Sequence, residues 1–140
     1  MSTTEPTRKH KSCFTVRGYE LDSYGHLNNA VYVQYLEQAR WEWTRDTGIL
    51  EIFQDKDIFL IVIETKIRYM QEALLFDELR VETEAKPANP FIVFNQRIIN
   101  QKTGKTISRA TVRTLFVDRK KIPQDIPDIV TKKINEAIYV

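Results

Sequence analysis

One long helical pattern constrains the fold of this chain most, because its other regular patterns are mainly those of strands. The pattern begins at Asn28 or Asn29, each a suitable N-cap, runs to about Thr47, and is stopped by Gly48. Apolar and aromatic side chains recur in it at helical spacing, namely Tyr32, Leu36, Ala39 and Trp43. The sequence therefore predicts a domain organised around one helix that buries one face.

Strand patterns precede and follow this helix. Alternating or continuous apolar segments predict strands at residues 13–17, 58–70, 77–86, 91–99 and 106–118. A short helical turn at 49–53 and a weak C-terminal helix at 128–138 are also expected. The segment 58–70 begins as a continuous apolar run and then alternates, which indicates a strand that leaves a covered region for a half-exposed one. This order predicts an α+β fold, an antiparallel sheet on one long helix.

Size and composition limit the function classes. The 140 residues fit one domain, expected at residues 11–140 after a flexible polar tail at residues 1–10. Hydrophobic residues make up 42% and charged residues 29%, which is a globular balance. The net charge of +2 is small, and the basic residues are interleaved with acidic ones, so nucleic acid is not an expected partner.

The cysteine and histidine content argues against a structural metal. Cys13 is the one cysteine, and His10 and His26 are far apart, so neither a disulfide nor a Cys/His zinc cluster is expected. The N-terminal segment lacks the apolar core of a signal peptide, and no window approaches a membrane span. These features predict a cytoplasmic protein.

A single acidic residue, Asp22, lies in a polar turn that leads directly into the predicted helix. The start of a helix offers unpaired N–H groups and a positive dipole end, which stabilise negative charge on a carbonyl oxygen. Asp22 could act as a general base on water or as a nucleophile that forms an acyl anhydride. The alternative is that Asp22 only caps its turn, as aspartates often do. A carboxylate beside an oxyanion site indicates acyl chemistry.

The string Asp22-Ser-Tyr-Gly-His-Leu-Asn-Asn29 closely resembles the Asp-x-x-Gly-His-x-Asn-Asn signature of hotdog-fold acyl-CoA thioesterases. The resemblance is to the 4-hydroxybenzoyl-CoA thioesterase-like branch, which includes bacterial long-chain acyl-CoA thioesterases. It is most specific over residues 17–40, and Tyr69, Asp77 and the Asp118-Arg-Lys end also look like this branch. It implies a hotdog fold, with a sheet wrapped round one helix. It also implies hydrolysis of an acyl-CoA to free acid and CoA without a metal or redox cofactor, since coenzyme A is part of the substrate.

The resemblance also implies residue roles. Asp22 becomes the favoured catalytic residue, and the oxyanion-stabilising amide falls near Asn29 in the first turn of the helix. His26 is expected to support the site by a hydrogen bond or by lining it. Many relatives carry a second Asp at the position of Glu20, so the role of this longer carboxylate is open.

Basic and aromatic residues supply candidates for substrate contacts. Three consecutive basic residues, Arg119, Lys120 and Lys121, follow the last predicted strand and could hold the phosphates of coenzyme A, or else form a solvated strand end. Aromatic and apolar helix residues could line an acyl tunnel, although core packing is the better interpretation; these are Tyr32, Tyr35, Leu36, Trp41 and Trp43.

Two rival functions and an assembly state are also considered. His26 with Glu37 would suit an acyl-thioester dehydratase or hydratase, but the His-Phe-Pro-Gly pattern of that family is absent. Otherwise Glu37 and Arg40, three residues apart on the helix, are expected to make a surface or interface pair. The other rival is a non-catalytic acyl-CoA or acyl-carrier binding protein, and an acyl carrier protein is a possible partner. Open sheet edges predict a homodimer, or a tetramer made of two dimers, as is typical of the family.

Overall fold

The computed structural model describes residues 7–139 of the chain. The helices are η1 (Gly18–Glu20), α1 (Asn29–Asp46), α2 (Ile49–Lys56) and α3 (Asp128–Glu136). The strands are β1 (His10–Thr15), β2 (Phe59–Tyr69), β3 (Glu78–Ala88), β4 (Phe91–Asn100) and β5 (Thr106–Val117).

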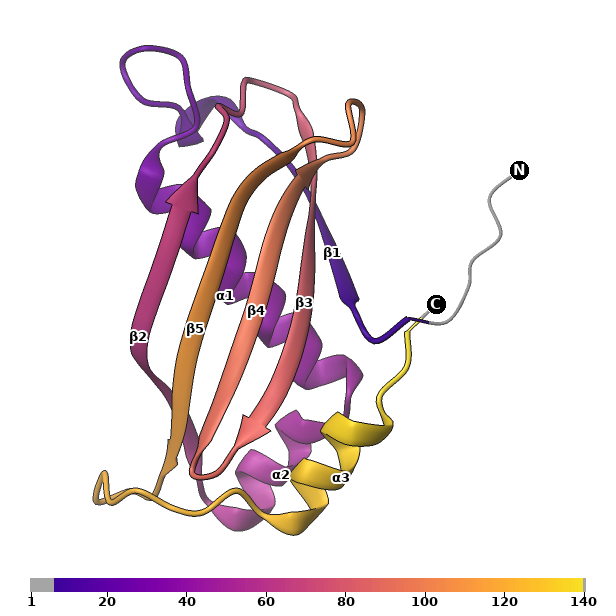
Figure 1. Ribbon diagram of the computed structural model, residues 1–140. Coiled ribbons are helices and arrows are strands. Elements are labelled where there is room, and N and C mark those ends of the chain that lie inside the picture. The colour runs from indigo at the N-terminus through magenta and orange to yellow at the C-terminus, as the bar shows by residue number, and fades with distance from the viewer. Residues whose placement is uncertain (1–6, 140) are drawn as a thin grey trace.

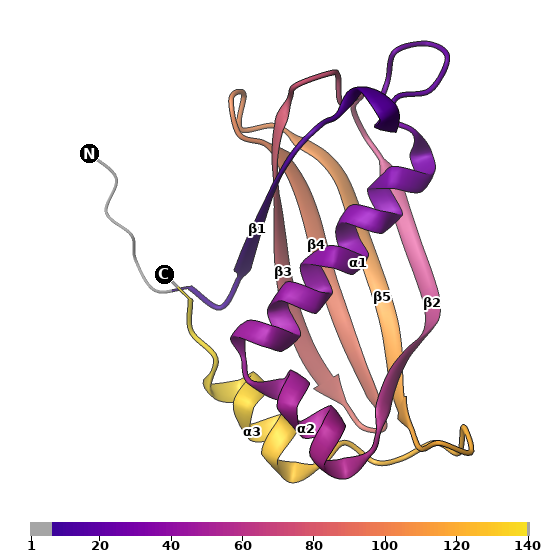
Figure 2. The ribbon, with the colours of Figure 1, turned by 180° about the vertical axis from the view of Figure 1, so that it is seen from behind.

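The five strands form one sheet in the order β1-β3-β4-β5-β2, and every neighbouring pair is antiparallel. Helix α1 crosses one face of this sheet, and α2 and α3 lie together at one end (Figures 1 and 2). No helix covers the opposite face of the described sheet (Figure 1). The predicted α+β arrangement of an antiparallel sheet around one long helix is confirmed.

The start and end of α1 follow from its sequence. The side chain of Asn28 accepts a hydrogen bond from the Ala30 N–H at 2.9 Å, so Asn28 is the N-cap. At the other end, Gly48 adopts a left-handed conformation with φ of 78°, which glycine tolerates without strain. This Gly48 conformation separates α1 from α2. Helix α2 extends to Lys56, beyond the predicted turn at 49–53, because Ile49 and Ile52 both bury their side chains.

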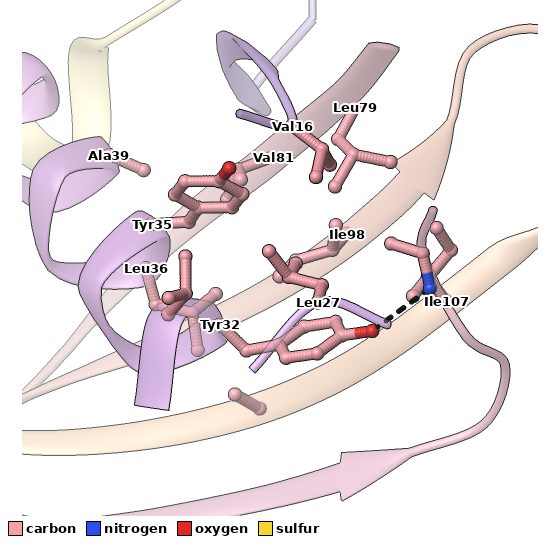
Figure 3. Packing of buried hydrophobic residues seen from close by; sticks show 13 residues of the cluster. Val16, Leu27, Tyr32, Tyr35, Leu36, Ala39, Leu79, Val81, Ile98 and Ile107 are labelled. Carbon is pink, nitrogen blue, oxygen red and sulfur yellow. Dashed lines mark hydrogen bonds between the residues drawn. The ribbon is translucent and has the colours of Figure 1, made fainter. Parts of the chain in front are cut away.

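One face of α1 packs against the inner face of the sheet. Tyr32, Tyr35, Leu36 and Ala39 on the helix meet apolar side chains that include Val81, Ile98 and Ile107 (Figure 3). A second cluster surrounds Trp43, whose ring packs edge-on against Phe94 with centroids 5.0 Å apart, and includes α2 and α3 residues. Tyr32, Tyr35, Leu36 and Trp43 are therefore core residues in this chain, whereas Trp41 is exposed.

Strand β1 begins earlier than predicted. His10 is its first residue and is only 4% exposed, because its Nε2 lies 2.7 Å from a carboxylate oxygen of Asp46 at the end of α1. Thr7 also pairs with Tyr139. The domain was predicted to begin at residue 11, but backbone pairing already begins at Thr7. Residues 1–6 of the expected tail lie outside the described residues.

The apolar start of β2 is not covered within this chain. Strand β2 is an edge strand that pairs with β5 alone, and its apolar side chains are exposed at Phe59, Ile61, Val62 and Ile63. The register with β5 shifts between Val62 and Glu64, which marks a β-bulge or other irregularity within this apolar segment. The predicted covered region is thus an open apolar edge.

Within residues 7–139, no helix is both long enough and apolar enough to cross a membrane.

Candidate active site

The turn between η1 and α1 is built around the carboxylate of Asp22. Asp22 Oδ1 accepts hydrogen bonds from the N–H groups of Tyr24 at 2.9 Å and His26 at 3.1 Å. The Asp22 N–H donates to the His26 carbonyl at 2.7 Å, and Gly25 takes a positive φ of 78° that completes the turn. One oxygen of Asp22 therefore caps its own turn, as the simpler interpretation of the sequence expected.

The second oxygen of Asp22 is available. Asp22 is exposed, and its Oδ2 has no hydrogen-bond partner among the described residues. The capped turn holds the carboxylate in one orientation through Oδ1. A fixed carboxylate with one free oxygen can accept a proton or attack an acyl carbon.

Asp22, His26 and Asn29 line one hollow of about 330 Å³, together with Leu27, Tyr32, Tyr69, Met70, Gln71 and Glu72. Asn29 is the first residue of α1, and among the described residues no acceptor takes its N–H. Its carbonyl accepts a hydrogen bond from the Tyr69 hydroxyl at 3.2 Å. The structure thus brings together the carboxylate, the histidine and the helix start that were predicted from the sequence.

The segment after β2 holds this loop in place. The Leu27 N–H donates to the Ala73 carbonyl at 2.9 Å, and the Tyr32 hydroxyl accepts from the Ala73 N–H at 3.2 Å. Burial raises the pKa of Tyr32, so its hydroxyl stays protonated. Tyr32 and Tyr69 meet edge-on with ring centroids 5.1 Å apart. Helix, loop and this segment are therefore joined on one side of the hollow.

His26 has a partner that the sequence did not indicate. Its Nε2 lies 3.2 Å from a carboxylate oxygen of Glu72. Glu37 lies elsewhere, in a groove between α1 and β2 lined also by Arg40 and Trp41. The rival His26–Glu37 combination does not form within one chain, because Glu37 lies eight positions after Asn29, roughly 12 Å along the helix axis.

Arg40 does not pair with Glu37 as predicted. Its guanidinium donates to the side-chain oxygen of Gln96 at 3.0 Å, and Gln96 in turn donates to the Leu36 carbonyl at 3.0 Å. Burial lowers the pKa of Arg40. Arg40 therefore lies between the helix and the sheet, and no Glu37–Arg40 ion pair is present within the described residues.

Glu20 has a structural position beneath the loop. Its side chain is buried and accepts hydrogen bonds from the Tyr35 hydroxyl at 2.6 Å and the Arg17 N–H at 2.9 Å. Burial and the Glu20 carboxylate raise the pKa of Tyr35, which keeps the hydroxyl a donor. The Glu20 carbonyl also accepts from the Asn28 N–H at 2.9 Å. Glu20 thus points into the protein and anchors both ends of the Asp22 turn.

Replacing Tyr35 by Phe is expected to destabilise the fold by about 1–3 kcal/mol, because the buried Glu20 carboxylate loses a hydrogen-bond donor. Urea unfolding measures the change. Tyr19→Phe is the matched control, since Tyr19 is largely exposed and should change stability little. Equal free energies of unfolding for the two variants would contradict the anchoring role of Glu20.

The basic cluster lies at the other end of the sheet from the hollow. Tyr69, which lines the hollow, pairs with Ser108, whereas Phe59 at the opposite end of β2 pairs with Val117 just before the cluster. In Figure 1 the purple loop that leads into α1 lies at the top, and the orange loop that follows β5 lies at the bottom. Arg119 Nε is 2.6 Å from an Asp57 oxygen. Arg119, Lys120 and Lys121 are exposed, and the structure does not bring them to Asp22 within one chain.

Among residues 7–139, no three histidine, cysteine or acidic side chains converge as metal ligands would. Neither the place of Glu72 beside His26 nor the burial of the Glu20 side chain was predicted from the sequence. Glu72 is the acidic residue of the polar turn after β2, which is the one signal that could have drawn attention to it.

A long helix packed on an antiparallel sheet, with a carboxylate turn at the start of that helix, is the arrangement expected for the hotdog-fold thioesterases that the sequence resembles. The chain belongs to the Thioesterase-like superfamily, whose family model matches residues 16–134.

Individual relatives agree with this membership. The chain is similar to the long-chain acyl-CoA thioesterase FadM of Escherichia coli (strain K12), with 30% identity over 106 residues that cover 75% of this chain and 80% of FadM. It is also similar to the chloroplastic acyl-acyl carrier protein thioesterase ATL3 of Arabidopsis thaliana, with 27% identity over 127 residues, 89% of this chain and 66% of that protein. The crystal structure of YbaW, a probable thioesterase from Escherichia coli, superposes with a TM-score of 0.82 at 24% identity, over 89% of this chain and 96% of that one. The protein is therefore an enzyme that hydrolyses thioesters.

Proposed function

We propose that the protein hydrolyses acyl-CoA thioesters to free acid and CoA in the hollow beside Asp22. The observation that carries this proposal is that a carboxylate with a free oxygen and an unpaired helix-start N–H line the same hollow. The similarity to FadM, which is named as a long-chain acyl-CoA thioesterase, supports acyl-CoA as the substrate class.

The Asn29 N–H would donate a hydrogen bond to the carbonyl oxygen of the thioester. Negative charge on this oxygen grows as the tetrahedral intermediate forms, and the helix start stabilises it. Loss of one such donor typically lowers turnover by about 100- to 1,000-fold. The unpaired Asn29 N–H therefore has the properties of an oxyanion donor.

Asp22 Oδ2 would deliver the attack in one of two ways. As a general base it removes a proton from water, whose oxygen then bonds to the acyl carbon while the carbon–sulfur bond breaks and the thiolate leaves. As a nucleophile it bonds to the acyl carbon, the carbon–sulfur bond breaks, and the CoA thiolate leaves; the resulting acyl anhydride is hydrolysed by water in a second step, which releases the acid and regenerates the Asp22 carboxylate. His26, paired with Glu72, would support the wall of the site in either case.

The exposed edge of β2 supports a homodimer. Phe59, Ile61, Val62 and Ile63 present apolar surface beside unpaired backbone groups, and a second copy of this strand would cover both. Antiparallel pairing of the two β2 strands turns the Phe59 end of one toward the Tyr69 end of the other. The basic cluster of one subunit would then approach the Asp22 hollow of its partner, where the phosphates of the coenzyme extend from the thioester.

Replacing Arg119, Lys120 and Lys121 together by Gln is expected to raise the KM for acyl-CoA by about tenfold, because charge-assisted contacts to phosphate are lost. A truncated pantetheine thioester lacks the nucleotide phosphates, so its KM should change by less than about twofold. Steady-state kinetics on the two substrates make the comparison. Equal changes would mean that the cluster is only a solvated strand end.

Two other functions make different predictions. A hydratase is disfavoured because His26 and Glu37 lie apart in the chain. The relative ATL3 is named as an acyl-acyl carrier protein thioesterase, so a thioester of an acyl carrier protein is an alternative substrate for this chain. A non-catalytic binding protein would keep the hollow without turnover.

That the protein is located in the cytoplasm remains a prediction from the sequence.

Release of CoA thiol over a series of acyl chain lengths tests the proposal. Hydrolysis releases one thiol per acid formed, hydration changes only the absorbance of an enoyl-CoA, and a binding protein does neither. Repeating the assay with acyl carrier protein thioesters identifies the donor. Absence of thiol release from every thioester would contradict the proposed function.

A further inference from the structure

A row of three arginines crosses the face of the sheet that no helix covers. Arg109 on β5 pairs in register with Arg68 on β2 and with Arg97 on β4. Residues paired in this way are neighbours on one face of a sheet, with strands about 5 Å apart. Like charges directly opposite each other are destabilising. Such a row therefore costs stability unless anions neutralise it.

The protein neutralises only one end of this row. Arg97 lies 3.4 Å from a carboxylate oxygen of Glu82, which Arg80 also approaches at 3.3 Å. Arg68 and Arg109 are exposed, and neither guanidinium has an ion-pair or hydrogen-bond partner among residues 7–139. Two adjacent positive charges are thus left without a counter-charge.

These two arginines line a shallow hollow of about 490 Å³, larger than the hollow beside Asp22. Lys66, Asn95 and Thr111 contribute further polar groups to its wall, and no acidic residue lines it. The Lys66 ammonium lies 3.9 Å from a carboxylate oxygen of Glu64, and Arg109 also lines a neighbouring hollow whose wall includes Glu82 and Glu84. The two hollows share no residue, so this is a separate feature of the surface.

We propose that the hollow formed by Lys66, Arg68 and Arg109 is a binding site for the diphosphate group of a phosphorylated small molecule. Arginine forks and a lysine ammonium are the groups that bind phosphate oxygens, and the hydroxyl of Thr111 and the amide of Asn95 can add donors. A diphosphate carries enough charge to contact three cations at once. Because the proposed function places the phosphates of the bound acyl-CoA at Arg119, Lys120 and Lys121, this diphosphate would come from a second molecule, either free CoA or a free nucleotide.

Binding of inorganic pyrophosphate to the intact protein tests the site without involving turnover. Titration calorimetry is run with sodium chloride adjusted to constant ionic strength, which separates specific binding from screening. Arg109→Gln is expected to weaken pyrophosphate binding by at least about tenfold, since a charge-assisted contact is lost. Arg113→Gln is the matched control, because Arg113 lies on the same strand and its guanidinium is already placed over the Phe91 ring at 4.3 Å. Its effect should be below about threefold.

Thermal unfolding gives a second, independent measurement. Without anion, Arg109→Gln should unfold at the same or a higher temperature than the wild type, because a like-charge contact is relieved. Saturating pyrophosphate should raise the wild-type midpoint by about 3 °C or more and that of Arg109→Gln by less than about 1 °C. No pyrophosphate binding, or equal loss in the two variants, would overturn the proposal.

The source of the diphosphate is assigned by titrating free CoA and ADP in the same way. If Arg109→Gln weakens binding of free CoA as strongly as that of pyrophosphate, the site takes a second coenzyme A, apart from the one whose phosphates the proposed function places at Arg119, Lys120 and Lys121. If CoA binding is unchanged while ADP binding is lost, the site serves a free nucleotide. Each result supports a diphosphate site and names its occupant.

Discussion

Asp22→Asn is expected to lower the turnover of an acyl-CoA by at least about 100-fold while the protein stays folded. The asparagine side chain keeps an oxygen that can accept the N–H groups of Tyr24 and His26, so the turn should persist. It removes the carboxylate oxygen that would take a proton or attack the acyl carbon. Thiol release and circular dichroism measure activity and fold on the same sample.

The chain offers a matched control in Asp118. Its Oδ1 accepts from the N–H groups two and four residues later, those of Lys120 and Ile122, which repeats the geometry of the Asp22 turn at the other end of the sheet. Asp118→Asn should leave kcat within about twofold of the wild type, because the asparagine oxygen can accept the same two hydrogen bonds and the side chain lies far from the Asp22 hollow. Near-normal turnover in folded Asp22→Asn, or an equal loss in the two variants, would show that Asp22 only caps its turn.

Replacing Ile61 and Ile63 by Lys is expected to convert the protein to a monomer at micromolar concentration and to lower its activity by at least tenfold. These side chains are exposed in one chain, so lysine should not disturb the fold of a subunit. Charged lysines on an edge strand oppose pairing with another edge. Sedimentation measures the assembly state, and thiol release measures the activity.

Ile129→Lys is the control for this edge variant. Ile129 is an exposed isoleucine of α3, away from the β2 edge, and its replacement should change neither assembly nor activity. An active wild-type monomer would contradict the dimer proposal. So would a variant at the β2 edge that stays dimeric and active.

The long helix and the strands after it could be predicted because local signals agreed with the packing. Asn28 caps α1, Gly48 ends it, and the side chains at helical spacing are those that the structure buries. The position of Asp22 beside the helix start could also be predicted, because the two lie only a few residues apart in the sequence.

Contacts between segments far apart in the sequence could not be predicted. His10 at the start of β1 contacts Asp46 at the end of α1, and His26 contacts Glu72. No local sequence pattern encodes either contact. The continuous apolar run of β2 was interpreted as covered, because a run of this kind is the same for a buried strand and for an edge awaiting a partner. The row formed by Arg68, Arg109 and Arg97 could not be predicted, because it depends on the register of three strands.

The central claim is that one hydrolytic site combines Asp22 of one subunit with the basic cluster of the other. Asp22→Asn can be refolded together with the variant in which Arg119, Lys120 and Lys121 are replaced by Gln. Random pairing makes half of the dimers mixed, and each mixed dimer holds one intact site.

Thiol release is then measured at an acyl-CoA concentration far below the KM of both proteins, where the triple variant alone keeps about one tenth and Asp22→Asn alone about one hundredth or less of the wild-type activity. The account predicts recovery of about one quarter of the wild-type activity, because a two-fold dimer restores one of its two sites in half of the molecules. Activity no higher than the mean of the two parent variants would contradict the shared site.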